Sequence, residues 1–179
     1  MFKRTHNCGD IRSSDIGNTI ILNGWVNKVR LHGQVVFVDL RDRYGKTQIL
    51  FDADEYAGDF EIIKKISMED VLSIKGIVRS RIESAINSNL ATGEIEILVS
   101  EFIMLNESAP LPFMLNDRSN AEEDLRLKYR YLELRMEELQ QNLMIRHKTY
   151  QAARSYLSEN KFVEVETPVL MKSTPEGAR

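Results

Sequence analysis

The sequence lacks the features of a disulfide-stabilised, secreted or membrane protein. It has one cysteine among 179 residues, Cys8, which excludes an internal disulfide and is typical of a reducing compartment. No apolar run approaches the roughly 18 residues that a membrane-spanning helix needs. The first residues, Met1 to His6, lack the apolar stretch of a secretory signal. We therefore expect a cytoplasmic protein with no membrane partner.

Recognisable catalytic motifs are missing as well. The sequence has no glycine-rich phosphate loop, no nucleophile elbow, and no histidines and cysteines at metal-binding spacing. Its three histidines, His6, His32 and His147, are scattered, and we expect each to be structural or solvated. The sequence thus predicts no metal site and no catalytic residue in this chain.

The charge balance limits the kind of nucleic-acid partner. With a formal net charge of −3, the chain is not a general attractor of phosphate. This charge argues against a protein that coats DNA. It is compatible with local basic patches that bind a short single-stranded loop.

Five segments between residues 19 and 105 have the composition and alternation of β-strands. Turn formers separate them at 31–33, 42–45 and 87–93, and a short helical pattern with apolar Phe60, Ile63 and Ile66 lies between the third and fourth strands. This order predicts a five-stranded OB-fold barrel over residues 1–105, a fold that commonly binds oligonucleotides. The expected strands are 19–30, 35–41, 47–52, 71–82 and 95–105.

Residues 106–120 form a break that contains two prolines and many turn formers, as expected of a hinge between domains. Helical composition follows over 121–135 and 139–160, and Asn160 can close the second helix. Residues 162–166 then alternate as a strand that Pro168 ends. We therefore expect residues 121–179 to be the incomplete start of an α/β domain, so that the whole chain is mainly β with an α/β stub.

Strand alternation assigns side chains to the two faces of the barrel. The expected outer face of the first three strands carries Arg30, Phe37 and Gln48, with Leu50 beside them. An aromatic ring can stack on an unpaired base, a glutamine amide can recognise a base edge, and arginines can contact phosphates or bases. The fourth strand is expected to add Arg79 and Arg81 to this face and to place Leu72, Ile74, Val78 and Ile82 in the core.

These residues also have simpler interpretations. An outward Phe37 can pack against a loop or a neighbouring domain, and Gln48 can be an ordinary solvated side chain. The segment Arg41 to Lys46 has the composition of a plain charged hairpin turn. Alternation alone leaves both interpretations open.

Several sequence blocks resemble the N-terminal part of bacterial-type aspartyl-tRNA synthetases, which are class II aminoacyl-tRNA synthetases. They span nearly the whole chain in the family's order. The blocks are Asn23-Gly-Trp-Val-Asn27 with Arg30 and Gly33, Phe37-Val-Asp-Leu-Arg-Asp-Arg43, Ala91-Thr-Gly-Glu-Ile-Glu96, Leu125-Arg-Leu-Lys-Tyr-Arg-Tyr-Leu-Glu-Leu-Arg135, the motif 1 segment Phe162-Val-Glu-Val-Glu-Thr-Pro168, and Thr174-Pro-Glu-Gly-Ala-Arg179.

The resemblance implies functions for particular residues. The barrel would bind a tRNA anticodon, with Phe37 stacking on a base, Gln48 recognising a base edge and Arg30 contacting the loop. Further candidates for the anticodon are Arg79, Arg81 and Asn87. Motif 1 would build a homodimer interface around Pro168, and Glu176 would contact the amino acid. The full-length enzyme would use ATP and Mg²⁺ to activate aspartate and would attach it to tRNA(Asp).

Departures from the family pattern carry two further expectations. Leu31 stands where the family usually has an acidic residue, and the following His32 resembles members that charge both tRNA(Asp) and tRNA(Asn); Ser84 lies near a second discrimination position. Class II motifs 2 and 3 are absent from the sequence. We therefore expect that this chain alone binds no cofactor and has no aminoacylation activity.

Two hypotheses from other classes remain at this point. The chain could be a free-standing OB-fold module that binds RNA or a protein without catalysis, and that retains the stub for dimerisation. It could also be a general single-strand binder, which would discriminate poorly among RNA loops and would bind with a strong dependence on salt.

Overall fold

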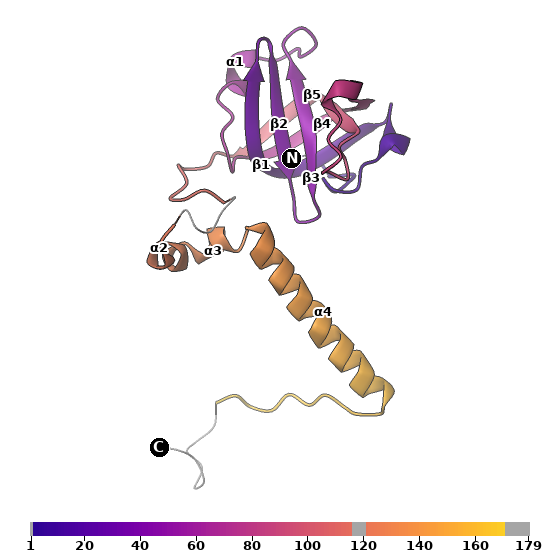
Figure 1. The fold of residues 1–179 in the computed structure, drawn as a ribbon, viewed down its shortest axis with the longest axis vertical. Helices are drawn as coiled ribbons and strands as arrows, with labels where there is room; N and C mark the ends of the chain where they lie inside the picture. Colours follow the sequence, from indigo (N-terminus) through magenta and orange to yellow (C-terminus); the bar gives the residue numbers. More distant parts are fainter. Residues whose placement is uncertain (1, 116–120, 171–179) are drawn as a thin grey trace. The chain divides into compact units, whose positions relative to one another are not determined.

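A computed structural model describes residues 2–115 and 121–170. The chain divides into two compact units, Met1–Pro110 and Leu111–Arg179, and each unit is described by itself (Figure 1). The division falls within the segment that the sequence predicts to be a hinge.

Five strands of the first unit close into a barrel in the order β1-β2-β3-β5-β4, with β4 paired to β1 (Figure 1). All neighbouring strands are antiparallel except β3 and β5, which are parallel. This closed arrangement confirms the predicted OB-fold. The elements of this unit are η1 (Ser13–Asp15), β1 (Thr19–His32), β2 (Val35–Arg41), β3 (Lys46–Asp52), α1 (Phe60–Ile63), β4 (Val71–Ser80), η2 (Glu83–Ala85) and β5 (Ile95–Asn106).

Strand boundaries follow the alternation to within two residues, and the largest differences are in β1 and β4. β1 continues to His32, so the turn between β1 and β2 is confined to Gly33 and Gln34, and Gly33 has the positive φ of 61° that such a tight turn requires. β4 ends at Ser80, two residues earlier than expected. The prediction that Ile82 points into the core is therefore wrong: it follows the strand, outside the ladder, and is exposed.

The core is the set of aliphatic inner faces that alternation predicts for the strands. Full burial of each such side chain stabilises the fold by about 1.5–3 kcal/mol. Phe51 is a buried member of the core and packs edge-on against Tyr56 and Phe102, with ring centroids 5.9 and 5.5 Å away. Buried members include Ile20, Leu22, Val26, Val36, Val38, Leu40, Ile49, Leu72, Ile74, Val78, Ile95 and Ile97.

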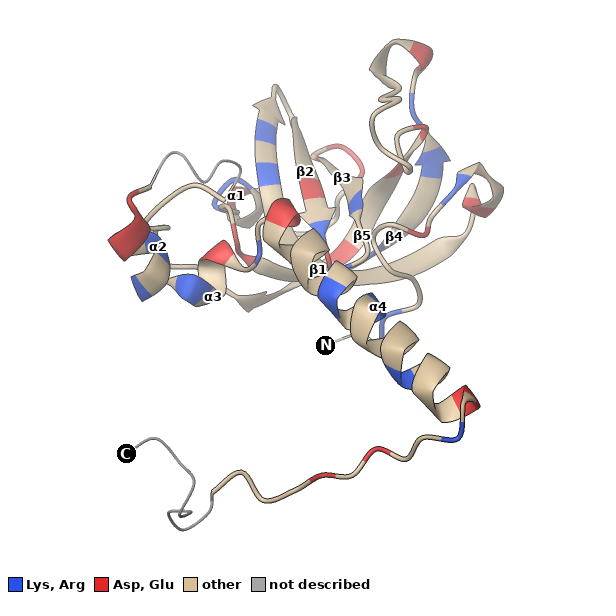
Figure 2. Ribbon diagram, turned by 60° about the horizontal axis from the view of Figure 1, so that its bottom comes forward, with Lys and Arg blue, Asp and Glu red and all other residues tan. Residues whose placement is uncertain are grey.

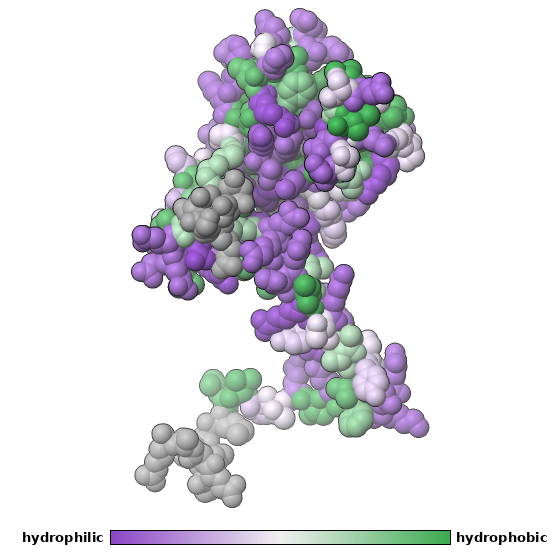
Figure 3. All heavy atoms as spheres, viewed as in Figure 1, coloured by the Kyte–Doolittle hydropathy of each residue, from purple (hydrophilic) through white to green (hydrophobic). Residues whose placement is uncertain are grey.

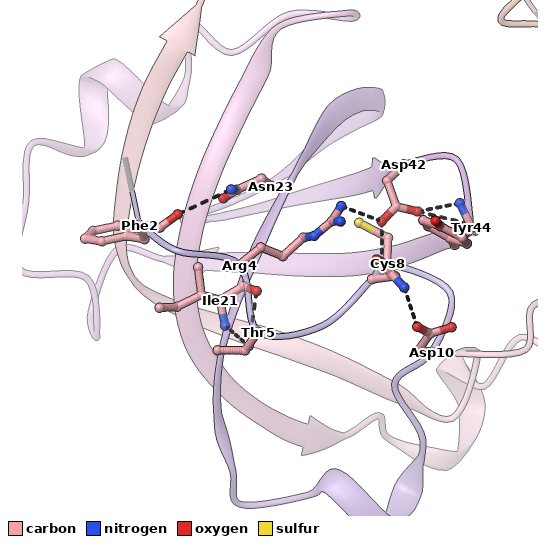
Figure 4. Close-up of polar contacts among 11 residues, drawn as sticks. Phe2, Arg4, Thr5, Cys8, Asp10, Ile21, Asn23, Asp42 and Tyr44 are labelled. Atoms are coloured by element: carbon pink, nitrogen blue, oxygen red, sulfur yellow. Dashed lines mark hydrogen bonds and ion pairs between the residues drawn. The ribbon is translucent and has the colours of Figure 1, made fainter.

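The N-terminal segment is tied to the barrel by backbone and carboxylate hydrogen bonds (Figure 4). Thr5 and Ile21 bond to each other, with the backbone N–H of Thr5 donating to the Ile21 carbonyl at 3.0 Å. The carboxylate of Asp42 accepts the backbone N–H groups of Cys8 (2.9 Å) and Tyr44 (2.7 Å). A Cβ on Gly9 would lie 2.1 Å from the Tyr44 carbonyl oxygen, so this contact requires glycine.

Cys8 belongs to this segment, and its side chain is fully buried in the core of the barrel. Burial and the neighbouring Asp42 carboxylate raise the pKa of its thiol, so the reactive thiolate is scarce at neutral pH. The residue therefore serves packing.

We predict that the Cys8 thiol of the native chain reacts with a thiol reagent such as DTNB more than about tenfold more slowly than in the urea-unfolded chain at pH 8. Stopped-flow absorbance would measure both rates. Equal rates would contradict the burial of this residue.

Among the described residues of the second unit, the helices are α2 (Glu123–Lys128), α3 (Arg130–Glu133) and α4 (Glu137–Glu159). The expected single helix over 121–135 is interrupted at Tyr129, whose φ of −108° and ψ of 42° are not helical. A small core of Phe113, Leu132 and Met136 holds α2 and α3 together. Glu133 has no exposed surface and pairs with the guanidinium groups of Arg126 and Arg130, which compensates for the burial of its charge.

The end of α4 confirms that the helix closes at Asn160, whose side-chain amide donates to the Tyr156 carbonyl at 2.8 Å. Lys161 then takes the left-handed conformation, and the backbone N–H of Phe162 donates to the Leu157 carbonyl, as in a Schellman motif. Arg154 of the helix pairs with Glu164 at 3.0 Å.

The predicted strand over residues 162–166 does not form. The segment is extended and exposed, and Val163 retains 83% of its surface. A strand requires a neighbouring strand, and none of the described residues pairs with this one. Apolar side chains therefore lie on the surface near the end of α4 and in the segment after it (Figure 3).

Candidate nucleic-acid interface

Strand register places five polar residues in one row across the outside of the barrel. Lys28 of β1 pairs with Asp39 of β2, and Asp39 pairs with Gln48 of β3. The parallel contact of β3 with β5 sets Gln48 beside Glu96, which in turn pairs with Arg79 of β4. Residues distant in sequence thus form one continuous strip.

Hydrogen bonds connect most of this strip. Arg30 donates one Nη2 group to Asp39 Oδ1 (2.7 Å) and to Gln48 Oε1 (3.0 Å). Gln48 Nε2 donates to Glu96 Oε2 at 2.7 Å, and Arg79 Nε donates to Glu96 Oε1 at 2.9 Å. We call Asp39, Arg30, Gln48, Glu96 and Arg79 the outer-face network.

A second row, one step along the strands, is mostly apolar. It runs from Arg30 to Phe37, Leu50, Leu98 and Ile77. Phe37 is half-buried, so part of its ring is accessible for stacking. Leu50 lies on the outer face, as expected, but it is buried there and retains only 2% of its surface.

Charges of both signs are interspersed on this side of the barrel. Glu55 adds a third carboxylate, 3.7 Å from Arg79 Nη1. Figure 2 shows acidic and basic residues interspersed over the strands and loops of the barrel. The guanidinium groups of Arg30 and Arg79 are already paired with carboxylates of the protein. This surface therefore favours hydrogen bonding and stacking over general attraction of phosphate.

Arg81 is not the exposed cation that alternation predicts. It retains 8% of its surface, and its Nε donates to the Ile95 carbonyl at 2.8 Å while Nη1 lies 3.5 Å from the Ala85 carbonyl. Burial lowers the pKa of this guanidinium, with Glu96 and Asp39 acting in the opposite direction. Its Nη2 is buried without a hydrogen-bond partner. Arg81 therefore ties the loop between β4 and β5 to the barrel, with one donor left over.

The loop between β4 and β5 holds Ser84 and Asn87. Ser84 is exposed within η2. Asn87 is half-buried, and its backbone closes the loop by lying against Gly93. The two residues are so close that a Cβ on Gly93 would lie 1.8 Å from the Asn87 carbonyl oxygen. His32 is exposed at the end of β1, beside the turn that leads to β2. These residues border the barrel without joining the outer-face network.

The remaining candidate residues belong to the second unit. Pro168 lies in the exposed extended segment after α4. Glu176 lies outside the described residues. Within the part of the chain that the structure describes, no group of acidic, histidine or cysteine side chains could hold a metal ion, and no helix is long and apolar enough to cross a membrane.

Asp39 and Glu96 are the members of the network that the sequence analysis missed. Both residues occur there only within the sequence blocks that resemble the family. The signal for Asp39 was available in the alternation of β2. The signal for Glu96 was not, because its place beside Gln48 depends on the parallel pairing of two strands 48 residues apart.

We predict that Arg81→Met loosens the loop between β4 and β5 without unfolding the barrel. Losing two hydrogen bonds from a guanidinium should cost about 1–3 kcal/mol locally, which corresponds to about 5- to 150-fold faster amide exchange. Hydrogen–deuterium exchange of residues 85–93 would measure this, with the amides of β2 as the internal control. Unchanged exchange in the loop would contradict the role of Arg81.

Comparison with known proteins identifies the family of this chain. A model of the OB-fold nucleic acid binding domain matches residues 20–105, and a model of the class II tRNA synthetases (D, K and N) matches residues 122–179. The aspartate–tRNA(Asp/Asn) ligase of Salinibacter ruber is 48% identical over 180 residues, which is 98% of this chain. That of Geotalea uraniireducens is 50% identical over 178 residues, or 99% of this chain. This chain belongs to the aspartyl-tRNA synthetase family.

As a member of this family, the chain spans only 29% and 30% of the length of these two relatives. Solved structures agree on the fold. The asparaginyl-tRNA synthetase of Pyrococcus horikoshii, complexed with asparaginyl-adenylate, matches 99% of this chain and 39% of its own with a TM-score of 0.84 and 24% identity. The aspartyl tRNA synthetase of Entamoeba histolytica matches 97% of this chain and 41% of its own with a TM-score of 0.83 and 24% identity.

Proposed function

We propose that this chain is the anticodon-binding part of an aspartate–tRNA ligase and that the outer face of its barrel recognises the anticodon loop. The observation that carries the proposal is the outer-face network, which presents one glutamine amide beside the accessible ring of Phe37. The free-standing module without catalysis is not favoured, because ligases match the chain over nearly its whole length.

Phe37 and Gln48 divide the recognition of a base between them. A half-exposed ring can stack on an unpaired base, which contributes about 1–3 kcal/mol and accepts any base. The amide of Gln48, on the neighbouring strand, supplies an acceptor and a donor for a base edge, which discriminates among bases. Both side chains belong to paired strands of a closed barrel, so little ordering is needed on binding.

The charges of this face favour base recognition over phosphate attraction. Three carboxylates, those of Asp39, Glu55 and Glu96, lie among three guanidinium groups, those of Arg30, Arg79 and Arg81. Such a balanced surface gives little counterion release on binding, so the salt dependence should be modest. A general single-strand binder would instead require an excess of positive charge and would show a strong salt dependence.

Other residues would complete the contact. Arg30 is the most exposed member of the network that carries positive charge, and its remaining N–H groups can reach the loop. The buried Nη2 of Arg81 would gain the partner it lacks if an RNA oxygen approached it, and Arg79 and Asn87 border the same region. His32 and Ser84 would relax the discrimination between tRNAs, in keeping with relatives named for both tRNA(Asp) and tRNA(Asn).

The complete enzyme would activate aspartate with ATP and Mg²⁺ in the cytoplasm and transfer it to tRNA. In that enzyme Glu176 would contact the amino acid, and the segment around Pro168 would lie at a homodimer interface. The exposed apolar residues after α4 support the last point, since Phe162, Val163 and Val165 would otherwise stay in contact with water.

We predict that Phe37→Ala and Gln48→Ala each weaken the binding of an RNA hairpin with the anticodon GUC by about 5- to 150-fold, equivalent to about 1–3 kcal/mol. Fluorescence anisotropy with a labelled hairpin would measure the dissociation constants. Tyr156→Ala and Gln151→Ala, which remove exposed side chains of the same types from α4, are the controls and should leave binding unchanged. If the unmutated chain bound a scrambled anticodon equally well, base recognition by this face would be ruled out.

We predict that the 179-residue chain forms no aspartyl-adenylate, because the sequence lacks motifs 2 and 3 of class II enzymes. ATP–pyrophosphate exchange in the presence of aspartate would detect adenylate formation. Exchange above the background of a chain-free reaction would refute this expectation.

A further inference from the structure

The Gln48 amide is held from both sides by groups of opposite hydrogen-bonding character. On one side, a guanidinium N–H of Arg30 lies 3.0 Å from Oε1. On the other, a carboxylate oxygen of Glu96 lies 2.7 Å from Nε2. A guanidinium can only donate, and a carboxylate can only accept.

Arg30 and Glu96 fix the orientation of the amide because one can only donate a hydrogen bond and the other can only accept one. If the amide were rotated by 180°, its NH₂ group would face the N–H of Arg30 and its oxygen would face the carboxylate of Glu96. Both hydrogen bonds would become repulsive contacts at a position where Gln48 retains only 8% of its surface. The two ends of an amide are otherwise nearly equal in shape, so Arg30 and Glu96 alone distinguish them.

The carboxylate of Glu96 is itself held in place. Its second oxygen accepts from Arg79 Nε at 2.9 Å, and its side chain is 11% exposed. Asp39 does the same for Arg30, since it accepts from the same Nη2 at 2.7 Å. Each charged neighbour of Gln48 therefore has a second partner: Arg30 is held by Asp39, and Glu96 is held by Arg79. Neither Arg30 nor Glu96 can turn away from the amide without losing the hydrogen bond to that partner.

The bonds to Arg30 and Glu96 use half of the capacity of the amide. A glutamine carbonyl oxygen has two lone pairs and its NH₂ group has two hydrogens, so one acceptor site and one donor site remain. A base edge that offers a donor next to an acceptor can use both, but only when its donor faces the β2 side and its acceptor faces the β5 side of the amide.

We propose that Glu96 is a positioning residue that, with Arg30, sets the polarity of the Gln48 amide and thereby decides which base edge the barrel accepts. This inference rests on the proposed function of the outer face. Glu96 acts through Gln48: it holds the outward donor on the β5 side and the outward acceptor on the β2 side.

Glu96→Gln tests the proposal with a nearly isosteric change. In the new amide at position 96 one of the two carboxylate oxygens is replaced by an NH₂ group, so either Gln48 Nε2 or Arg79 Nε faces a donor, and the polarity of the Gln48 amide is no longer fixed. Binding should be compared for GUC hairpins in which each anticodon base is replaced in turn by the other three. At the position that Gln48 recognises, the preference for the best base should fall about tenfold, while the other two positions keep their preferences.

The double variant Gln48→Glu with Glu96→Gln separates positioning from folding. Swapping amide and carboxylate keeps every hydrogen bond in the network: Arg30 donates to the new carboxylate, the new amide N–H donates to it as well, and Arg79 donates to the new amide oxygen. The melting temperature should therefore stay close to that of the unmutated chain. Position 48 would then offer only acceptors, so the same base preference should be lost.

The outcomes distinguish this proposal from the proposed function. If the unmutated chain prefers the GUC hairpin but either variant keeps the full base preference, the positioning role is overturned and anticodon binding stands. The same holds if Glu96→Gln weakens all hairpins equally, or if the swapped variant loses cooperative melting, because both results make Glu96 purely structural. If the unmutated chain shows no preference, both proposals fail.

Discussion

The parallel contact between β3 and β5 is the constraint on which the rest of this surface depends. It comprises the pairs Ile49–Ile97 and Leu50–Leu98, and it closes the barrel. The inner members of these pairs lie in the core, so the apolar packing that stabilises the fold also fixes the register. That register sets Gln48 beside Glu96, and a slip of one residue in either strand would turn that strand's polar side chain to the inner face. Stability and the proposed recognition therefore rest on the same few contacts.

Under the proposed function, the outer face favours discrimination at a modest affinity. Its guanidinium groups are neutralised by carboxylates of the protein, so they orient neighbours such as Gln48 instead of gathering phosphate. The energy of binding would then come from stacking on Phe37 and from a small number of directed hydrogen bonds. Such a domain would gain affinity from being joined to other tRNA-binding parts, because linked sites act at a high effective concentration.

The sequence was sufficient for most of the fold and for part of the site. Alternation gave β2 its full extent and put Phe37 and Gln48 on the outer face, because period-two patterning reports directly on which side is buried. It could not give the role of Glu96, which depends on a non-local parallel pairing. It misplaced Arg81, whose long side chain folds back under the loop from Ile82 to Glu94 to reach the carbonyls of Ile95 and Ala85. It also predicted a strand over 162–166, where alternation is present but none of the described residues supplies a partner strand.

Nuclear magnetic resonance of the Gln48 side-chain amide tests the central claim most directly. In a ¹⁵N-labelled chain, the two Nε2 proton resonances of Gln48 should shift when the GUC hairpin is added and should stay in place with a scrambled hairpin. The side-chain amide of Gln140, which bonds to the Arg135 carbonyl in the second unit, serves as the internal reference and should not move. Unshifted Gln48 resonances at saturating GUC hairpin would contradict the account that this amide recognises an anticodon base.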